Sequence, residues 1–118
     1  MKLQLEGQHL RFRVDEAEFA RLLSGETVES ATSLPGATVT LQVSSISEGS
    51  PALSASDGRI TLQLPIADLL AYQQRLPCRD GLAFVQQVDA GEPLQVAFEV
   101  DVRDSIRNRG PRRREPSA

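Results

Sequence analysis

The chain has 118 residues, of which 40% are hydrophobic and 25% charged, and its formal net charge is −3. This size and composition predict a single soluble globular domain with its own core, and they exclude a two-domain enzyme and wholesale disorder. A lone cysteine, Cys78, excludes an internal disulfide framework and favours a reducing, cytoplasmic setting, and no run approaches the ~20 apolar residues of a membrane span.

The first predicted element is a β-hairpin. Apolar and polar side chains alternate over residues 2–6 and again over 10–14, on either side of Gly7. A short helix from about Glu16 to Ser24 follows. Asp15 and the glutamate three residues later resemble a capping box, apolar residues recur at i, i+3 and i+4, and Gly25 is placed to end the helix.

Strands are predicted on both sides of the turn Pro35-Gly36, at residues 27–33 and 38–44, and residues 45–51 have the composition of a loop. The pattern then restarts. Residues 53–55 and 60–64 predict two strands joined by the hairpin turn Asp57-Gly58.

Pro65 suits the first position of a second helix, whose apolar stripe is Ile66, Leu69 and Leu70. A loop is predicted at 74–81. The last two predicted strands are residues 82–88 and 94–102, joined through a turn at Ala90-Gly91.

The two halves of the chain have the same order of patterns at an offset of 50 residues. Leu3 falls on Leu53, Leu10 on Ile60, and the following apolar positions continue the match, although identity is nearly absent. We therefore expect an α+β fold of about eight strands in two ββαββ pseudo-repeats with two short helices. The sheet would be mainly antiparallel and curled or barrel-like. Chance similarity between two ββα units is the alternative.

Charge divides the chain into two parts. Residues 1–102 carry seven basic and fourteen acidic residues, whereas 103–118 carry six arginines against two acidic residues. This predicts a β-rich domain at 1–103 and a basic tail at 104–118 without a core of its own. The tail either folds back on the acidic body or binds an acidic partner or phosphate, and the residues that would do so are Arg107, Arg109, Arg112, Arg113 and Arg114. The absence of interleaved aromatic residues argues against nucleic acid.

Catalytic chemistry has little support in the sequence. His9 is the only histidine and has no partner at a catalytic or metal-binding spacing, so we interpret it as a solvated turn residue. Cys78 lies near Arg75 and Arg79 but without a base, which favours an ordinary loop thiol. We predict no catalytic residue, metal or cofactor, and the sequence leans against an enzyme.

Arg11 and Arg13 project from one face of their strand, and Arg59 occupies the equivalent face in the second half. In an open sheet this is the solvated side. In a closed barrel with its polar face inward, the three arginines would instead form a clamp for an anionic ligand.

The predicted order over residues 1–25 is a strand, a glycine, a second strand containing Leu-Arg-Phe-Arg, a helix and another glycine. In the second half of the chain a helix begins with a proline. This pattern resembles a family of small bacterial proteins catalogued only as a domain of unknown function. The resemblance implies no activity and no site residue.

The function predicted from these observations is a non-enzymatic cytosolic accessory or protein-binding module with an unidentified protein partner, acting as a monomer or homodimer away from membranes. The alternatives are a small-molecule anion binder or enzyme that uses the strand arginines, and nucleic-acid contact through the tail.

Overall fold

The computed structural model describes residues 1–78 and 80–102, which form eight strands and two helices. In chain order these are β1 (Lys2–Glu6), β2 (His9–Asp15), α1 (Glu16–Leu23), β3 (Val28–Leu34), β4 (Ala37–Ile46), β5 (Ala52–Ser56), β6 (Arg59–Pro65), α2 (Ile66–Arg75), β7 (Leu82–Gln86) and β8 (Leu94–Asp101). The predicted α+β class and the order of the elements are confirmed.

The hairpins form where the turn residues predict them. Asp57 and Gly58 both have positive φ, 52° and 76°, which is the conformation that an Asp-Gly pair favours between two antiparallel strands. Gly7, with φ of 56°, lies in the equivalent turn between β1 and β2. Both hairpins are antiparallel, and the side-chain alternation therefore places one face of each pair in the core.

The helices differ from the prediction in detail. Pro65 is the N-cap of α2 rather than its first helical residue, and α2 continues to Arg75, into the segment predicted as a loop. The buried residues of α2 are Leu69 and Tyr72, whereas Leu70 is 47% exposed. The predicted apolar stripe of α2 was therefore wrong at Leu70. Tyr72, three residues after Leu69, faces the core, whereas Leu70 does not.

The strands form two separate sheets, which corrects the prediction of one curled or barrel-like sheet. Sheet A has the order β1-β2-β8-β7, and sheet B has the order β3-β4-β6-β5. Each sheet joins two antiparallel pairs through a parallel pair at its centre, β2 with β8 and β4 with β6. Among the described residues neither sheet closes. Side-chain periodicity shows which face of a strand is apolar but not which distant strand it pairs with, so it did not predict this division.

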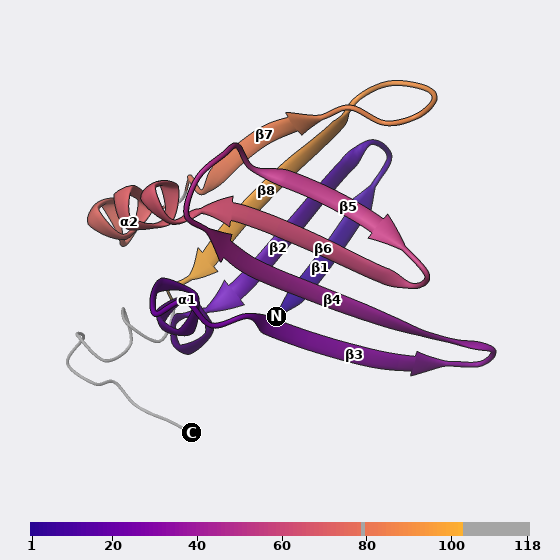
Figure 1. Ribbon diagram of the computed structural model, residues 1–118, viewed down its shortest axis with the longest axis horizontal. Coiled ribbons are helices and arrows are strands. Elements are labelled where there is room, and N and C mark those ends of the chain that lie inside the picture. The colour runs from indigo at the N-terminus through magenta and orange to yellow at the C-terminus, as the bar shows by residue number, and fades with distance from the viewer. Residues whose placement is uncertain (79, 103–118) are drawn as a thin grey trace, which may run out of the picture.

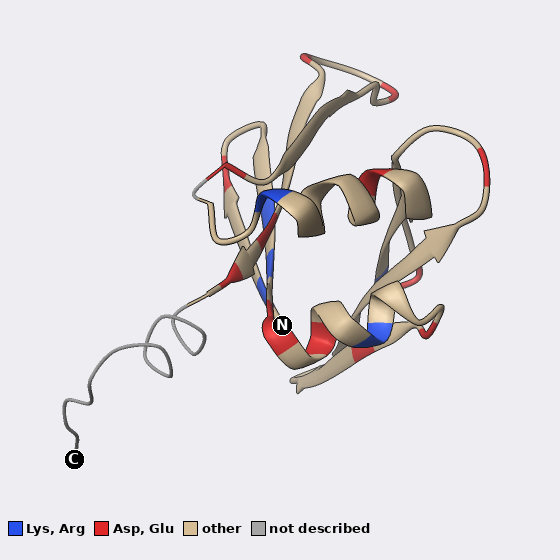
Figure 2. Ribbon diagram, turned by 90° about the vertical axis from the view of Figure 1, so that its left-hand side faces the viewer, with Lys and Arg blue, Asp and Glu red and all other residues tan. Residues whose placement is uncertain are grey.

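Figure 1 shows sheet B crossing in front of sheet A, with both helices at the same end of the two sheets. Figure 2 looks at that end and shows α1 and α2 in front of the space between the sheets. The space is filled by one hydrophobic core, to which both sheets and both helices contribute. Phe19, Tyr72 and Phe98 form its aromatic centre, with ring centroids 5.7 to 6.3 Å apart.

The orientation of β2 decides where the polar face of sheet A points. Leu10, Phe12 and Val14 are buried, whereas Arg11 and Arg13 are exposed. The arginines therefore lie on the outer face of sheet A, and the arrangement in which they line the inside of a closed barrel does not occur.

Candidate functional site

The outer face of sheet A is built from the polar positions of four strands. The register aligns Lys2 with Arg13 and Glu99 in one row, and Gln4 with Arg11, Ala97 and Ala83 in the next. The third row consists of Glu6, His9, Gln95 and Val85. Since alternate residues of a strand point to opposite faces, the same alternation that builds the core builds this polar surface.

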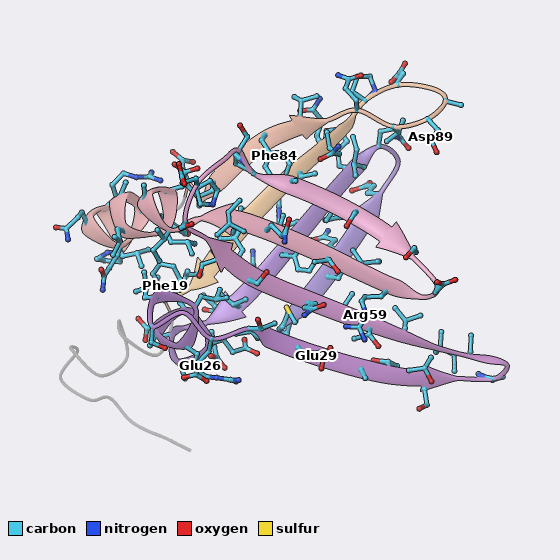
Figure 3. The ribbon with its side chains drawn as sticks, in the orientation of Figure 1. Phe19, Glu26, Glu29, Arg59, Phe84 and Asp89 are labelled. Atoms are coloured by element: carbon cyan, nitrogen blue, oxygen red, sulfur yellow. The ribbon has the colours of Figure 1, made fainter. Side chains whose placement is uncertain are left out.

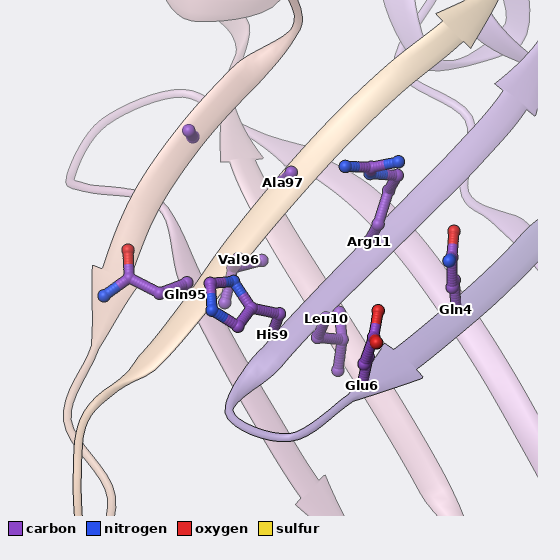
Figure 4. Close-up of a pocket in the computed structure, with 9 residues that line it drawn as sticks. Gln4, Glu6, His9, Leu10, Arg11, Gln95, Val96 and Ala97 are labelled. Carbon is purple, nitrogen blue, oxygen red and sulfur yellow. The ribbon is translucent and has the colours of Figure 1, made fainter.

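A hollow of about 150 Å³ opens on this face (Figure 4). Its lining residues are Gln4, Glu6, His9, Leu10, Arg11, Ala83, Gln95, Val96 and Ala97. Figure 4 shows Arg11 reaching from β2 toward Ala97, with His9 beside Gln95. The hollow exists because Ala97 and Ala83 are short and are bordered by long polar side chains.

A second depression of about 170 Å³ adjoins the first and is basic. Its lining includes Lys2, Arg11 and Arg13, and it shares Gln4 and Arg11 with the hollow. The two depressions together form a continuous surface, neutral over the alanines and positively charged beside them. We call this surface the sheet A face.

One carboxylate joins the two arginines. Glu99 Oε1 lies 3.0 Å from Arg13 Nη2, and Glu99 Oε2 lies 3.3 Å from Arg11 Nε. The Glu99 side chain is 19% exposed, whereas the two arginine side chains are 47% and 44% exposed. Lys2 forms no side-chain hydrogen bond or ion pair with the described residues. Only the two arginines therefore share the Glu99 carboxylate, and Lys2 is a third cation on the same face.

Acidic residues border this basic centre at both ends. Glu6 stands at the turn end of the face, and Asp15 is paired with Asp101 at the helix end. Asp15 Oδ1 is engaged in capping α1, where it accepts from the Glu18 N–H at 2.7 Å. Arg11 and Arg13 therefore lie between acidic positions at both ends of the face.

The third predicted arginine lies elsewhere. Arg59 projects from β6 in sheet B, where its Nη1 lies 2.7 Å from Glu29 Oε2 and donates to Gln42 Oε1 at 3.0 Å (Figure 3). The structure therefore brings together Arg11 and Arg13 but not Arg59. β2 belongs to sheet A and β6 to sheet B, so the side chains that the predicted offset of 50 residues aligned are separated.

The other residues considered from the sequence also have clear positions. His9 is exposed at the rim of the hollow. The Cys78 thiol donates to the Asp80 carbonyl at 2.8 Å, and Arg75 Nη1 lies 3.7 Å from its sulfur. Among residues 1–78 and 80–102 no cluster of side chains is suited to a metal ion. The predicted tail residues, Arg107, Arg109, Arg112, Arg113 and Arg114, lie outside the described residues.

Sequence reasoning missed Glu99 and the two alanines. Glu99 reaches Arg11 and Arg13 only because β8 pairs with β2 in parallel. Ala83 and Ala97 form the floor because β7 pairs with β8. The sequence predicted the last two strands, but no local signal connected these residues with β2.

The structure is thus an α+β protein with two sheets, and the outer face of sheet A is polar with basic residues at its centre. The chain belongs to a family of unknown function, DUF7009, whose model matches residues 1–106. This confirms the predicted resemblance to a domain of unknown function. No curated protein and no solved structure gives a significant match. In the described part of the chain, neither helix has the length and apolar character needed to cross a membrane.

Proposed function

We propose that this protein is a non-enzymatic binding module that recognises an acidic segment of a protein partner through Arg11 and Arg13 on the sheet A face. The observation that supports the proposal is the position of Glu99, whose carboxylate contacts both guanidinium groups at 3.0 and 3.3 Å. Charge-assisted hydrogen bonds between guanidinium and carboxylate are among the stronger polar contacts in proteins. This surface is therefore preorganised for carboxylates.

The two arginines retain donors for a ligand. A guanidinium group has five N–H donors, and Glu99 takes few of the ten that the pair offers. Both side chains are about half exposed. Lys2 adds a third cation on the same face. An incoming carboxylate can therefore bind beside Glu99 without displacing it.

A protein segment fits the sheet A face better than a free metabolite does. An exposed ion pair contributes only about 0 to 1 kcal/mol, so a small anion held by these side chains alone would bind weakly. A segment that follows the strands can place one carboxylate at Arg11 and Arg13 and a neutral side chain in the adjoining hollow, between Gln4 and Gln95. The added contacts supply affinity that a single anion lacks.

The test is a titration of a fluorescein-labelled oligoglutamate peptide, followed by fluorescence anisotropy. We expect the double variant Arg11→Ala/Arg13→Ala to weaken binding at least ~10-fold, because it removes two charge-assisted contacts. Arg59→Ala is the matched control. Its side chain is similarly exposed, at 49%, and is also ion-paired, but it lies on sheet B, so binding should change less than ~2-fold.

Competing ligands decide between the alternatives. Inorganic phosphate and citrate should displace the peptide only at much higher concentration, and single-stranded DNA should compete no better than the peptide itself. Equal or tighter binding of a small anion would favour a metabolite-binding protein and overturn the proposal. Binding that survives the double variant and disappears on deletion of residues 104–118 would assign the interaction to the tail.

Glu99 provides a second variant with the opposite expected sign. Glu99→Gln removes the carboxylate that shares the two arginines and leaves the size of the side chain unchanged. We expect tighter binding of the oligoglutamate peptide, by several-fold, because the face becomes more positive. Weaker binding would mean that Glu99 holds the two arginines in place for the ligand, and that this outweighs its repulsion of an incoming carboxylate.

The proposed module acts in the bacterial cytoplasm, and the lone, unpaired thiol of Cys78 supports a reducing setting. Fractionation of the source cells with an antibody to the protein tests this, and recovery in an extracytoplasmic fraction would contradict it.

We also infer that the two halves are pseudo-repeats of one ββαββ unit. The support is a matching strand pairing between the halves. The second strand of the first half, β2, pairs in parallel with the last strand of the second half, β8, and likewise β6 of the second half pairs in parallel with β4 of the first. A circular permutant that starts at Pro51 should fold if residue 102 is joined to residue 1 by a linker as long as the segment 47–51, which connects β4 to β5. If permutants with several different linkers of this length all failed to fold, this would argue against the equivalence of the two halves.

A further inference from the structure

β3 is an edge strand of sheet B with an unusual composition for its position. It is seven residues long, and its one charged side chain, Glu29, is already ion-paired with Arg59 at 2.7 Å. From residue 30 to residue 46, through the hairpin and β4, no charged residue occurs. Proteins normally protect a long edge strand with charged side chains, proline or a bulge, because its free backbone groups pair readily with another strand.

The other three edge strands are better protected. β1 has five residues and carries a charge at each end, Lys2 and Glu6. β5 and β7 are equally short, and they approach each other, since the Leu53 N–H on β5 donates to Gln86 Oε1 on β7 at 3.0 Å. β3 is therefore the longest edge strand of the described chain, and its exposed part carries only a charge that is already paired (Figure 1).

The end of the β3–β4 hairpin is exposed on both faces. Residues 31–38 are all exposed, and the Leu34 side chain retains 50% of its accessible surface. Leu34 lies on the same face of β3 as Val28, which is buried in the core. Leu34 thus continues the apolar, core-facing side of sheet B into a region that the rest of the described chain does not cover.

We propose that β3 pairs in antiparallel fashion with β3 of a second copy of this chain, about a twofold axis at Ala31. In this register Ala31 faces Ala31 of the other copy, and Leu34 lies opposite the other copy's Val28. Glu29 lies opposite Ser33 rather than a second glutamate, so no like charges meet. The two sheets B then form one continuous eight-stranded sheet.

The self-complementary register favours a second copy over an unrelated strand. The exposed Leu34 comes to lie beside the other copy's Val28, the small Ala31 lies on the axis, and the single charge keeps its partner within its own chain. An edge of seven residues gives a small interface, so the dimer should be weak and depend on concentration. The pairing uses sheet B alone and does not depend on the proposed binding function of the sheet A face.

Sedimentation velocity from about 10 µM to about 1 mM tests the pairing, since this range brackets weak dimers. We expect the full-length chain to show a concentration-dependent dimer. Ala31→Lys and Ala31→Glu each place like charges opposite each other on the axis and should raise the dimer dissociation constant at least ~10-fold. An equimolar mixture of the two variants should restore dimerisation, because opposite charges then meet.

Thr38→Lys and Thr38→Glu are the matched controls. Thr38 is exposed on the same face of the hairpin, but it lies on β4, away from the edge, and should leave the dimer unchanged. Circular dichroism verifies that every variant folds. A monomer at all concentrations, a dimer that tolerates Ala31→Lys, or a mixture that stays monomeric would each overturn the proposal. Wild-type dimerisation with unaltered oligoglutamate binding would show that the two surfaces act separately.

Discussion

Tyr72 joins α2 to β8 through a buried hydrogen bond. Its side chain is fully buried, and its hydroxyl accepts from the Val100 N–H at 3.0 Å. Tyr72→Phe keeps the ring in contact with the aromatic centre but leaves that N–H without an acceptor. We expect the free energy of unfolding, measured with urea, to fall by about 1 to 3 kcal/mol. Leu70→Ala, at an exposed position of the same helix, should cost less, and an equal cost would contradict this role for the hydroxyl.

The same hydroxyl gives the stability an alkaline dependence. Burial raises the pKa of Tyr72 above its ordinary value of 10.0, although the Val100 hydrogen bond acts in the opposite direction. Folding thus favours the neutral phenol. Its contribution is complete below pH 10.0 and is lost as the pH rises through the higher pKa of the folded state.

Tyr72 is the only tyrosine, so its ultraviolet titration reports this residue alone. Urea unfolding of the wild type should lose stability more steeply above about pH 10 than unfolding of Tyr72→Phe does. Parallel pH profiles for the two proteins would show that the phenol ionises equally easily in the folded and unfolded chain. The comparison cancels the contributions of groups that both proteins have in common.

At the scale of the element, α1 has a complete capping box and α2 has no side-chain cap. Asp15 Oδ1 accepts from the Glu18 N–H at 2.7 Å, and the Asp15 N–H donates to Glu18 Oε1 at 2.9 Å. Asp15→Ala should lower the free energy of unfolding by about 1 kcal/mol, whereas Asp15→Asn keeps an acceptor and should lose less. Glu16→Gln, in the first turn but outside the box, is the control and should cost a few tenths of a kcal/mol. Equal losses for Asp15→Ala and Asp15→Asn would indicate a charge effect rather than a cap.

The elements were predictable because their signals are local. The cap at Asp15, the Asp57-Gly58 turn and the alternation along β2 each act within a few residues, and the structure confirms all three. The end of α2 was not predictable in the same way. Helical periodicity allows either Leu70 or Tyr72 to face inward, and only the position of α2 against β8 and α1 selects Tyr72.

At the scale of the whole molecule, the candidate site shows the same limit. The alternation along β2 correctly placed Arg11 and Arg13 on one face, because that relation is internal to a strand. Glu99 could join them only through the parallel pairing of β2 with β8, which connects opposite ends of the chain. Grouping Arg59 with them assumed a single sheet, and the division into two sheets placed it on the other one.

The same division makes the contact between β5 and β7 important for the molecule as a whole. Gln86 Oε1 accepts from the Leu53 N–H at 3.0 Å and so connects an edge of sheet A to an edge of sheet B. The two sheets otherwise share one core, whose fully buried residues come from other elements, while Leu53 of β5 and Phe84 of β7 pack against it partly buried. Gln86→Ala should therefore loosen the edges without unfolding the core.

Native-state hydrogen exchange measures this difference directly. In Gln86→Ala we expect the Leu53 amide to exchange about tenfold faster, corresponding to about 1.4 kcal/mol, while the amide of Leu62 in the buried centre of sheet B keeps its rate. Gln63→Ala removes an exposed glutamine from β6 and should change neither rate. Faster exchange at both Leu53 and Leu62 would instead mean that the edge contact stabilises the whole fold. The two sheets would then open as one cooperative unit rather than at the β5–β7 side alone.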